Sequence, residues 1–279
     1  MPNLRAFLLI SGFMLFTVPL MPVQLVLRAF GGDPARRFPH WYHRQVCRIL
    51  GVAVHTQGQV AQDRPVRLVS NHVSWLDIPV LSAVAPLSFV AKAEVGTWPF
   101  ISWLAKLQNS VFVDRERPRL VQDTAREIVA RLRRGDHIVI FAEGTSSDGN
   151  QVLPFKTSLF AAARPRGKDA AGPEQGIYVQ TIGLGYTHQY GLPLGRRGRP
   201  GVAWYGDMEI VGHAWSLLKR GRLDVHVHVS KPVPLSDFAD RKALAVFTEE
   251  QVRRTVARIL SPRTELVVTE KPVQDKAKP

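Results

Sequence analysis

The chain opens with a long apolar run. Residues 6–27 contain no charged side chain and are mostly Leu, Phe, Met, Val and Ile, which is enough for a helix to cross about 30 Å of hydrocarbon. Pro19 and Pro22 lie inside the run, and because each removes a backbone donor we expect a division near Pro19 into two shorter pieces. A single span and a shallow hairpin both fit this pattern. A secretory signal peptide and a buried core helix are the alternative interpretations.

Beyond residue 50, short β-branched runs alternate with longer amphipathic stretches, which is typical of an α/β domain with a central mixed sheet covered by helices. Strands are expected at 66–69, 87–91, 111–113, 137–141, 178–184 and 224–229. Helices are expected at 79–85, 99–107, 119–134, 159–163 and 248–260. Irregular loops are expected at 165–176 and in the basic run 195–201 (GRRGRPG). The sequence thus predicts a membrane-attaching segment at 1–48, one domain at 49–260 and a loose tail at 261–279.

The net charge of the chain indicates which kinds of molecule it binds. The 37 Lys and Arg residues outnumber the 23 Asp and Glu residues, which gives a net charge of +14 and favours anionic partners such as phosphates, lipid headgroups or acidic carrier proteins. Arg5 precedes the apolar run and most of the nearby arginines follow it, so the positive-inside rule places the main domain on the cytoplasmic side of the membrane. Cys47 is the single cysteine, which excludes an intramolecular disulfide and a Cys-rich metal site.

The sharpest chemical pattern is N-H-V-S-W-L-D at 71–77, directly after an expected strand. Pro79 is tolerated only in the first turn of a helix, so the helix should begin near Asp77 and leave His72 in the preceding loop. The loop can then fold back so that the Asp77 carboxylate accepts a hydrogen bond from one imidazole nitrogen. Such a pair makes a general base. Alternatively, Asp77 only caps the helix and His72 only bonds to the backbone.

Two further strand ends carry polar residues. The strand at 111–113 leads into Asp114 and Arg115, and a guanidinium there could hold a phosphate or carboxylate. The strand at 137–141 leads into a turn containing Glu143, Gly144 and Thr145, whose N–H groups could form an anion-binding nest, with Lys156 following. Taken singly, the first pattern is more typical of a solvated charge run and the second of an ordinary turn.

In this order, the three patterns resemble the glycerolipid acyltransferases of the 1-acylglycerol-3-phosphate acyltransferase (PlsC-like) family. Residues 71–77 are similar to the family's N-H-x4-D block, residues 112–115 to its second block, and residues 141–146 (FAEGTS) to its F-P-E-G-T-R-S block. Residues 179–182 match the fourth block loosely. The resemblance covers about residues 50 to 210.

The resemblance implies an O-acyltransferase that moves a fatty acyl chain from acyl-ACP or acyl-CoA to the free hydroxyl of a lysolipid at the membrane. His72 would be the general base and Asp77 its orienting partner. Arg115 would bind the acceptor headgroup with help from the 143–145 turn and Lys156, and no metal or other cofactor would be required. The first expectation for the acceptor is 1-acyl-sn-glycerol-3-phosphate, which would give phosphatidate. The implied fold has an apolar acyl tunnel and N-terminal membrane helices.

Three departures from the family blocks bear on the acceptor. Ala142 and Gln180 replace prolines, and Ser146 stands where the family has an arginine. Loss of that arginine removes a charge-assisted contact to phosphate, typically about 1.5–3 kcal/mol. Acylation of lyso-ornithine lipid, whose headgroup is an amino acid, is therefore the alternative. A non-enzymatic basic protein that binds membrane or nucleic acid fits the charge but no recognised nucleic-acid motif, and a metal-assisted hydrolase lacks a ligand cluster such as H-E-x-x-H.

Overall fold

The computed structural model of the chain describes residues 2–113, 118–161 and 176–261. Asp114 and Arg115, most of the expected loop at 165–176 and nearly all of the expected tail lie outside these ranges.

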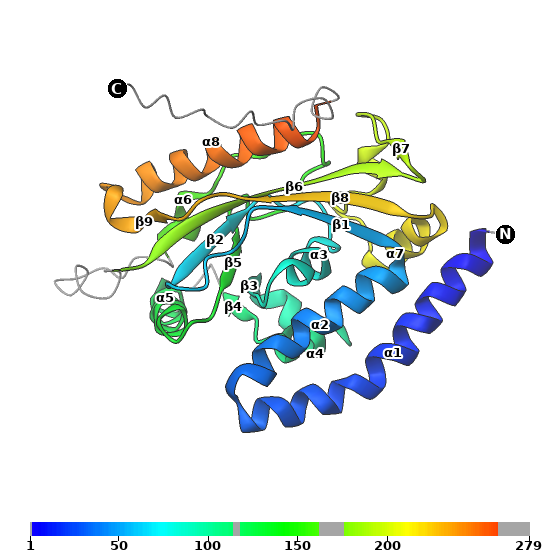
Figure 1. Cartoon of the computed structure of the whole chain (residues 1–279), viewed down its shortest axis with the longest axis horizontal. Helices are drawn as coiled ribbons and strands as arrows, with labels where there is room; N and C mark the ends of the chain where they lie inside the picture. The colour runs from blue at the N-terminus through cyan, green and yellow to red at the C-terminus, as the bar shows by residue number, and fades with distance from the viewer. Residues whose placement is uncertain (1, 114–117, 162–175, 262–279) are drawn as a thin grey trace, which may run out of the picture.

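One mixed sheet organises the described part of the chain (Figure 1), in the order β1-β8-β6-β2-β5-β3-β4. Within it, β6 runs antiparallel to β8, and the other neighbours in this order pair in parallel. Two short strands, β7 and β9, pair with β6. The bounds are β1 Val52–Gln57, β2 Val66–Ser70, β3 Ser88–Lys92, β4 Val111–Val113, β5 Ile138–Phe141, β6 Tyr178–Gln189, β7 Leu192–Pro193, β8 Leu223–Val229 and β9 Val233–Pro234. The expected α/β fold with a mixed sheet is confirmed.

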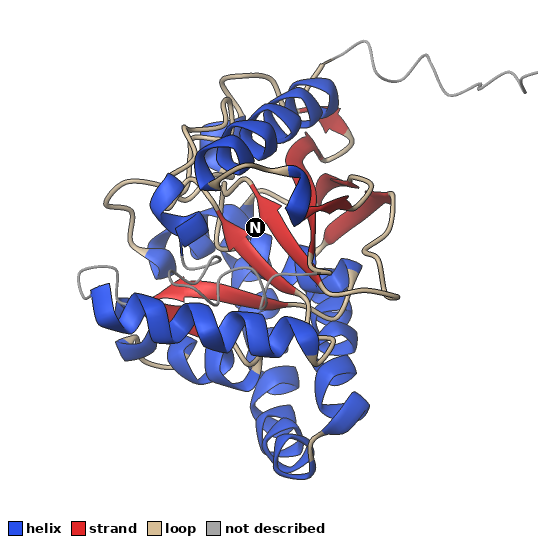
Figure 2. Cartoon of the chain, turned by 90° about the vertical axis from the view of Figure 1, so that its left-hand side faces the viewer, coloured by secondary structure: helices blue, strands red, loops and turns tan. Residues whose placement is uncertain are grey.

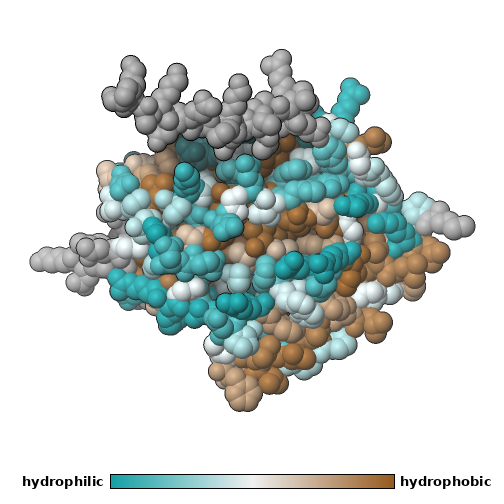
Figure 3. Space-filling view, in the orientation of Figure 1, coloured by the Kyte–Doolittle hydropathy of each residue, from teal (hydrophilic) through white to brown (hydrophobic). Residues whose placement is uncertain are grey.

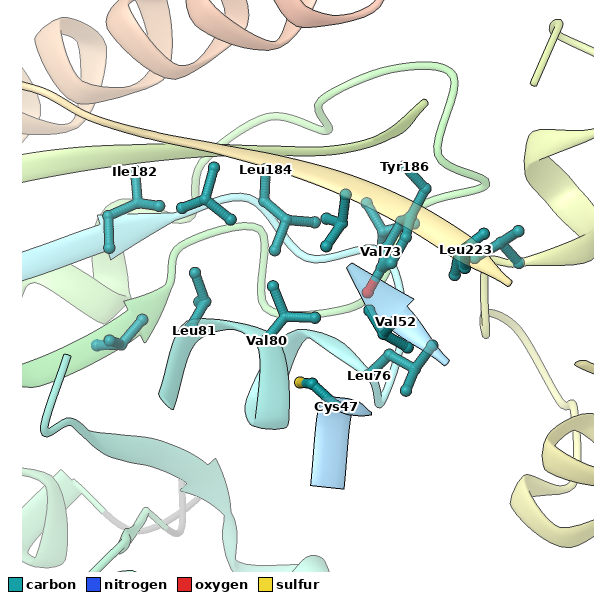
Figure 4. Close-up of a cluster of buried hydrophobic side chains, with 14 of the residues drawn as sticks. Cys47, Val52, Val73, Leu76, Val80, Leu81, Ile182, Leu184, Tyr186 and Leu223 are labelled. Atoms are coloured by element: carbon teal, nitrogen blue, oxygen red, sulfur yellow. The ribbon is translucent and has the colours of Figure 1, made fainter. Parts of the chain in front are cut away.

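Helices cover both faces of the sheet (Figure 2). The first core contains buried side chains of α2 (Gly32–Leu50), α3 (Asp77–Val84) and α7 (Ile210–Lys219), which pack with β6 and β8. Figure 4 shows part of this core, where Val80 and Leu81 of α3 lie below Ile182 and Leu184 of β6. On the other face, α5 (Pro118–Arg133), α6 (Thr157–Ala161) and α8 (Arg241–Ile259) form a second core. The central strand β2 is buried throughout because both of its faces are covered.

The N-terminal segment forms a pair of helices. α1 runs without a break from Pro2 to Phe30 with both prolines inside it, so the expected division near Pro19 is wrong. The helix continues because α2 packs beside it: the rings of Phe16 and Tyr42 stack at 5.7 Å, and Thr17 is hydrogen-bonded to Tyr42. α1 is also bonded to the main domain near both ends, since the Arg5 guanidinium donates to the Leu218 carbonyl and that of Arg28 to the Lys106 carbonyl in α4 (Ile101–Leu107).

The outer face of α1 is apolar. Among the described helices, α1 alone is long and apolar enough to cross a membrane, and little of it is buried. Its exposed large side chains form an apolar band along the lower edge of the molecule (Figure 3), and they include Leu4, Phe7, Leu8, Met14, Leu15, Val18, Val23, Leu25, Val26 and Phe30. This face is suited to association with a membrane.

Most expected elements are present with shifted ends, and several were not predicted. α8 begins seven residues earlier than expected, where the Asp240 carboxylate accepts hydrogen bonds from the Lys242 and Ala243 N–H groups and caps the helix. α2, β1 and α7 were missed. α2 extends past the expected boundary at residue 48, and its last turn is part of the first core.

Candidate active site

His72 and Asp77 meet at the carboxyl end of β2. The strand ends at Ser70, residues 71–76 form a loop, and α3 begins at Asp77. Nδ1 of His72 lies 2.7 Å from Oδ2 of Asp77, the contact expected from Pro79 and the spacing. The Asp77 side chain is fully buried, whereas 18% of the His72 side chain is exposed. The pair therefore consists of a buried carboxylate and an imidazole that is partly exposed to solvent.

Hydrogen bonds from four donors hold the Asp77 carboxylate. Oδ2 accepts from the His72 ring and from the backbone N–H groups of Val73 (2.6 Å) and Ser74 (3.0 Å). Oδ1 accepts from the hydroxyl of Tyr186 at 2.7 Å. Backbone and hydroxyl donors of this kind stabilise the ionised carboxylate and fix its orientation.

The His72 ring has one nitrogen left for chemistry. It stacks on Phe141 with the ring centroids 4.1 Å apart, which fixes the plane of the imidazole. Since Nδ1 is directed to Asp77, Nε2 is the nitrogen that can accept a proton, and none of the described residues is seen to hydrogen-bond to it. The pair has the geometry of a base oriented by a carboxylate.

Glu143 ties the two loops of the site together. Because β2 and β5 pair in parallel, with Ser70 opposite Phe141, the loops that follow them meet at one edge of the sheet. Oε1 of Glu143 accepts from the His72 N–H, and Oε2 accepts from the Leu153 N–H, both at 2.7 Å. Burial raises the pKa of Glu143 to about 7 against the opposing effect of these two N–H groups. Both oxygens of this carboxyl are thus engaged by main-chain donors.

The other predicted binding residues that the structure describes are not held in the site by contacts of their own side chains, as Glu143 is. Gly144 has a φ of 72°, and its N–H donates to the Phe141 carbonyl, which closes the turn. Thr145 is exposed. Lys156 is also exposed; its backbone N–H donates to the Ala142 carbonyl, and no contact is seen between its side chain and the described residues of the site. Arg115 lies outside the described residues.

Two of the departures from the family blocks have structural explanations. The hydroxyl of Ser146 donates to the Trp204 carbonyl, so it joins the 143–147 turn to the chain before α7. The buried amide of Gln180 accepts from the Ala61 N–H and donates to the carbonyls of Gln59 and Ser230. Gln180 therefore joins β6 to two flanking segments.

Sequence analysis gave no role to three side chains that build this site. Tyr186 holds Asp77, and Phe141 packs on His72. The amide of Asn71 is paired with Leu184: its nitrogen donates to the Leu184 carbonyl, and its oxygen accepts from the Leu184 N–H, both at 2.9 Å. Asn71 and Phe141 could have been found because they lie in the recognised blocks, whereas Tyr186 comes from a strand more than 100 residues away.

Comparison with known proteins identifies the family. A family model described as "Acyltransferase" matches residues 51–185. The lyso-ornithine lipid O-acyltransferase of Brucella abortus is 42% identical over 251 residues, which cover 90% of this chain and 93% of that protein. The chain belongs to the acyltransferase family. It is therefore an enzyme that transfers acyl groups, and the resemblance to this family is confirmed.

Other relatives extend the comparison. The lyso-ornithine lipid O-acyltransferase of Rhizobium meliloti is 39% identical, covering 91% of this chain and 87% of that protein. The 1-acyl-sn-glycerol-3-phosphate acyltransferase of Neisseria meningitidis serogroup B is 32% identical, and the match covers 72% of this chain and 73% of that protein. The crystal structure of the acyltransferase PlsC from Thermotoga maritima has the same fold, with a TM-score of 0.63 at 21% identity over 93% of this chain and 98% of that one.

Within residues 2–113, 118–161 and 176–261, no group of three or more His, Cys, Asp or Glu side chains is placed to hold a metal ion. His226 and His228 share a face of β8, where His226 stacks on His55. A cavity of about 40 Å³ lies between α1, α2 and α4, and neither His72 nor Asp77 lines it. The acyl tunnel implied by the resemblance stays a prediction.

Proposed function

We propose that this acyltransferase moves a fatty acyl chain from a thioester donor to the free hydroxyl of lyso-ornithine lipid. The observation that carries the chemistry is the His72–Asp77 pair, in which a buried, hydrogen-bonded carboxylate orients an imidazole that is partly exposed. The acceptor comes from the relatives of highest identity among those described, which are named for this reaction.

The proposed reaction needs one base. Nε2 of His72 takes the proton of the acceptor hydroxyl as its oxygen attacks the thioester carbonyl, and Asp77 stabilises the imidazolium that forms. The tetrahedral intermediate then collapses, the carbon–sulfur bond breaks, and the thiolate takes the proton back from His72. Because the thioester is already activated, the enzyme mainly positions the hydroxyl about 3–3.5 Å from the carbonyl. We propose no metal or other cofactor for these steps.

Ser146 supports an acceptor without a phosphate. At the position of the family's arginine, the chain has a hydroxyl that is itself bonded to the Trp204 carbonyl. This position therefore supplies no cation. A phosphate headgroup loses a charge-assisted contact when the arginine is missing, and an amino-acid headgroup loses less. In this proposal Arg115 and Lys156 supply positive charge for the acceptor or donor, and the 143–145 turn shapes the site.

The proposed location is the cytoplasmic face of the membrane. The apolar outer face of α1 suits a lipid bilayer, and the arginines that follow α1 favour the anionic cytoplasmic leaflet. The donor is an acyl thioester carried by acyl carrier protein or coenzyme A.

The decisive experiment offers purified enzyme two acceptors side by side, lyso-ornithine lipid and lysophosphatidate, with the same acyl thioester. We expect transfer to lyso-ornithine lipid to dominate, and His72→Ala to abolish it while membrane binding and fold are kept. Ser146→Arg should raise the ratio of lysophosphatidate to lyso-ornithine turnover. Dominant transfer to lysophosphatidate would replace the proposed acceptor, and near wild-type transfer by His72→Ala would refute the proposed base.

A further inference from the structure

The basic loop 195–201 is a part of the chain that the proposed chemistry does not use. It holds Arg196, Arg197 and Arg199 within four positions, interrupted only by Gly198. The side chains of Arg196 and Arg197 are exposed, and neither guanidinium forms an ion pair with a described residue. Two uncompensated charges side by side generate a local positive field.

The structure holds this loop firmly. Leu194, Val202 and Ala203 at its ends are buried, and the Leu194 N–H donates to the Thr187 carbonyl at 2.6 Å. Within the loop, the Gly195 carbonyl accepts from the N–H groups of Gly198 and Arg199. The arginine pair is therefore presented on a fixed backbone, which lowers the entropy that a partner must overcome on binding.

The loop lies beside the candidate active site. Asn150, three residues after Ser147, donates from its amide to the Arg196 carbonyl and accepts from the Arg199 guanidinium. A Cβ added at Gly149 would lie 3.2 Å from the side chain of Val73 and 3.5 Å from that of Arg199. Since Val73 is the neighbour of His72 in the chain, a molecule bound on this loop would lie close to the catalytic imidazole.

The loop reaches both faces of the sheet, because its buried ends Leu194, Val202 and Ala203 belong to the first core, whereas Arg199 extends to the opposite face. The Arg199 guanidinium donates to the Leu260 carbonyl at the C-terminal end of α8. α8 covers the face of the sheet opposite to that of α1 and α2 (Figure 1). A bilayer bound by α1 would not cover the α8 face that Arg199 reaches, so this contact favours a soluble acidic partner over anionic lipid.

We infer that the 195–201 loop, through Arg196 and Arg197, docks the acidic surface of the carrier protein that brings the acyl thioester. This inference rests on the proposed function and selects acyl carrier protein as the donor. The loop increases the rate at which the carrier protein binds, because charges at the rim of an interface raise the association rate and its salt sensitivity more than they change the chemical step. The thioester then enters the site at His72 from the water side.

The test compares three donors on the full chain in nanodiscs of zwitterionic lipid: palmitoyl-acyl carrier protein, palmitoyl-CoA and the uncharged palmitoyl-N-acetylcysteamine thioester. R196E/R197E should lower kcat/KM with the carrier protein about tenfold or more, mainly through KM, and remove its salt dependence. With the other two donors, kcat/KM should change less than about twofold. The matched control K231E/K242E makes the same change of charge at exposed positions; Lys242 lies in the first turn of α8, about 25 Å from the Leu260 contact. It should leave all three donors unchanged.

Several results would overturn the docking site. The first is an unchanged kcat/KM of R196E/R197E with the carrier protein. The second is an equal loss of kcat/KM with all three donors, or with palmitoyl-CoA as well as the carrier protein. The third is weaker binding of R196E/R197E to vesicles that contain phosphatidylglycerol. Titration of the enzyme with carrier protein in the absence of acceptor measures docking independently of turnover, and R196E/R197E should weaken it about tenfold. Failure of the wild-type enzyme to acylate any lysolipid with any of the three donors would instead refute the proposed function.

Discussion

The Tyr186 hydroxyl bonds to the oxygen of Asp77 that His72 does not contact, at 2.7 Å. Burial raises the pKa of Tyr186 well above its ordinary value, so the hydroxyl stays a donor over the working range of pH. Tyr186→Phe should leave a buried carboxylate oxygen unpaired, at a cost of about 1–3 kcal/mol. We expect kcat to fall about 5- to 100-fold with little change in KM for the lysolipid. Steady-state kinetics with circular dichroism checks this, and an unchanged kcat in folded protein would show that Tyr186 only packs.

The charge of Asp77 can be tested apart from its hydrogen bonds. In Asp77→Asn, the amide oxygen can still accept from His72, Val73 and Ser74, and the amide nitrogen can donate to the hydroxyl oxygen of Tyr186. The fold should persist, but the negative charge that stabilises the imidazolium is lost. We expect kcat to fall about 10²- to 10⁴-fold with a melting temperature near that of the wild type. Asp77→Ala, which strands the two N–H groups, should instead melt earlier.

Glu143 should make stability depend on pH. Its pKa in the folded protein is about 7, above its ordinary value of 4.5, so between these values the folded state holds more protons than the unfolded state. The unfolding free energy should therefore fall as pH rises through this window, and stay level above it. Thermal melts of wild type and Glu143→Gln at pH 5.5 and 8 check this, because glutamine does not titrate. The advantage of the wild type over the variant should shrink at pH 8, and parallel curves would contradict the raised pKa.

The outer face of α1 should carry membrane binding. Leu15 on α1 is 79% exposed, and Val246 on α8, on the other side of the sheet, is 67% exposed. A charged side chain at the centre of the hydrocarbon costs about 2.5–3.5 kcal/mol. Leu15→Glu should therefore reduce co-sedimentation with lipid vesicles, while Val246→Glu should not. Equal loss for both variants would show that the vesicles bind another surface.

The sequence predicts the fold class and the His72–Asp77 contact because both depend on local rules. Short apolar runs mark the buried strands, and Pro79 fixes where α3 begins, which leaves His72 in a loop that can turn back. The join between the 71–77 and 143–147 loops follows from parallel pairing of β2 and β5, which a list of strands does not supply.

Tyr186 shows why the rest escaped prediction. Glycines at 183 and 185 weaken the strand signal, so the strand was expected to end at 184. They are required because a Cβ at Gly183 would lie 2.4 Å from Thr255, and one at Gly185 would lie 2.8 Å from Ile259 on α8. β6 therefore continues to Gln189 and carries Tyr186 to the opposite face, toward α3. The division at Pro19 failed for a similar reason, since packing against α2 is not visible in α1 alone.

The bonds that join Arg5 to Leu218 and Arg28 to Lys106 have a mechanical consequence. With both ends of α1 attached to the α/β domain, that helix cannot stand upright in a bilayer while the domain remains in water. On a bilayer that binds the outer face of α1, this helix would lie along the surface and hold the domain at one height and one tilt above the lipid. An acceptor can then find the imidazole by lateral diffusion in two dimensions, and the doubly acylated product can leave sideways without passing through water.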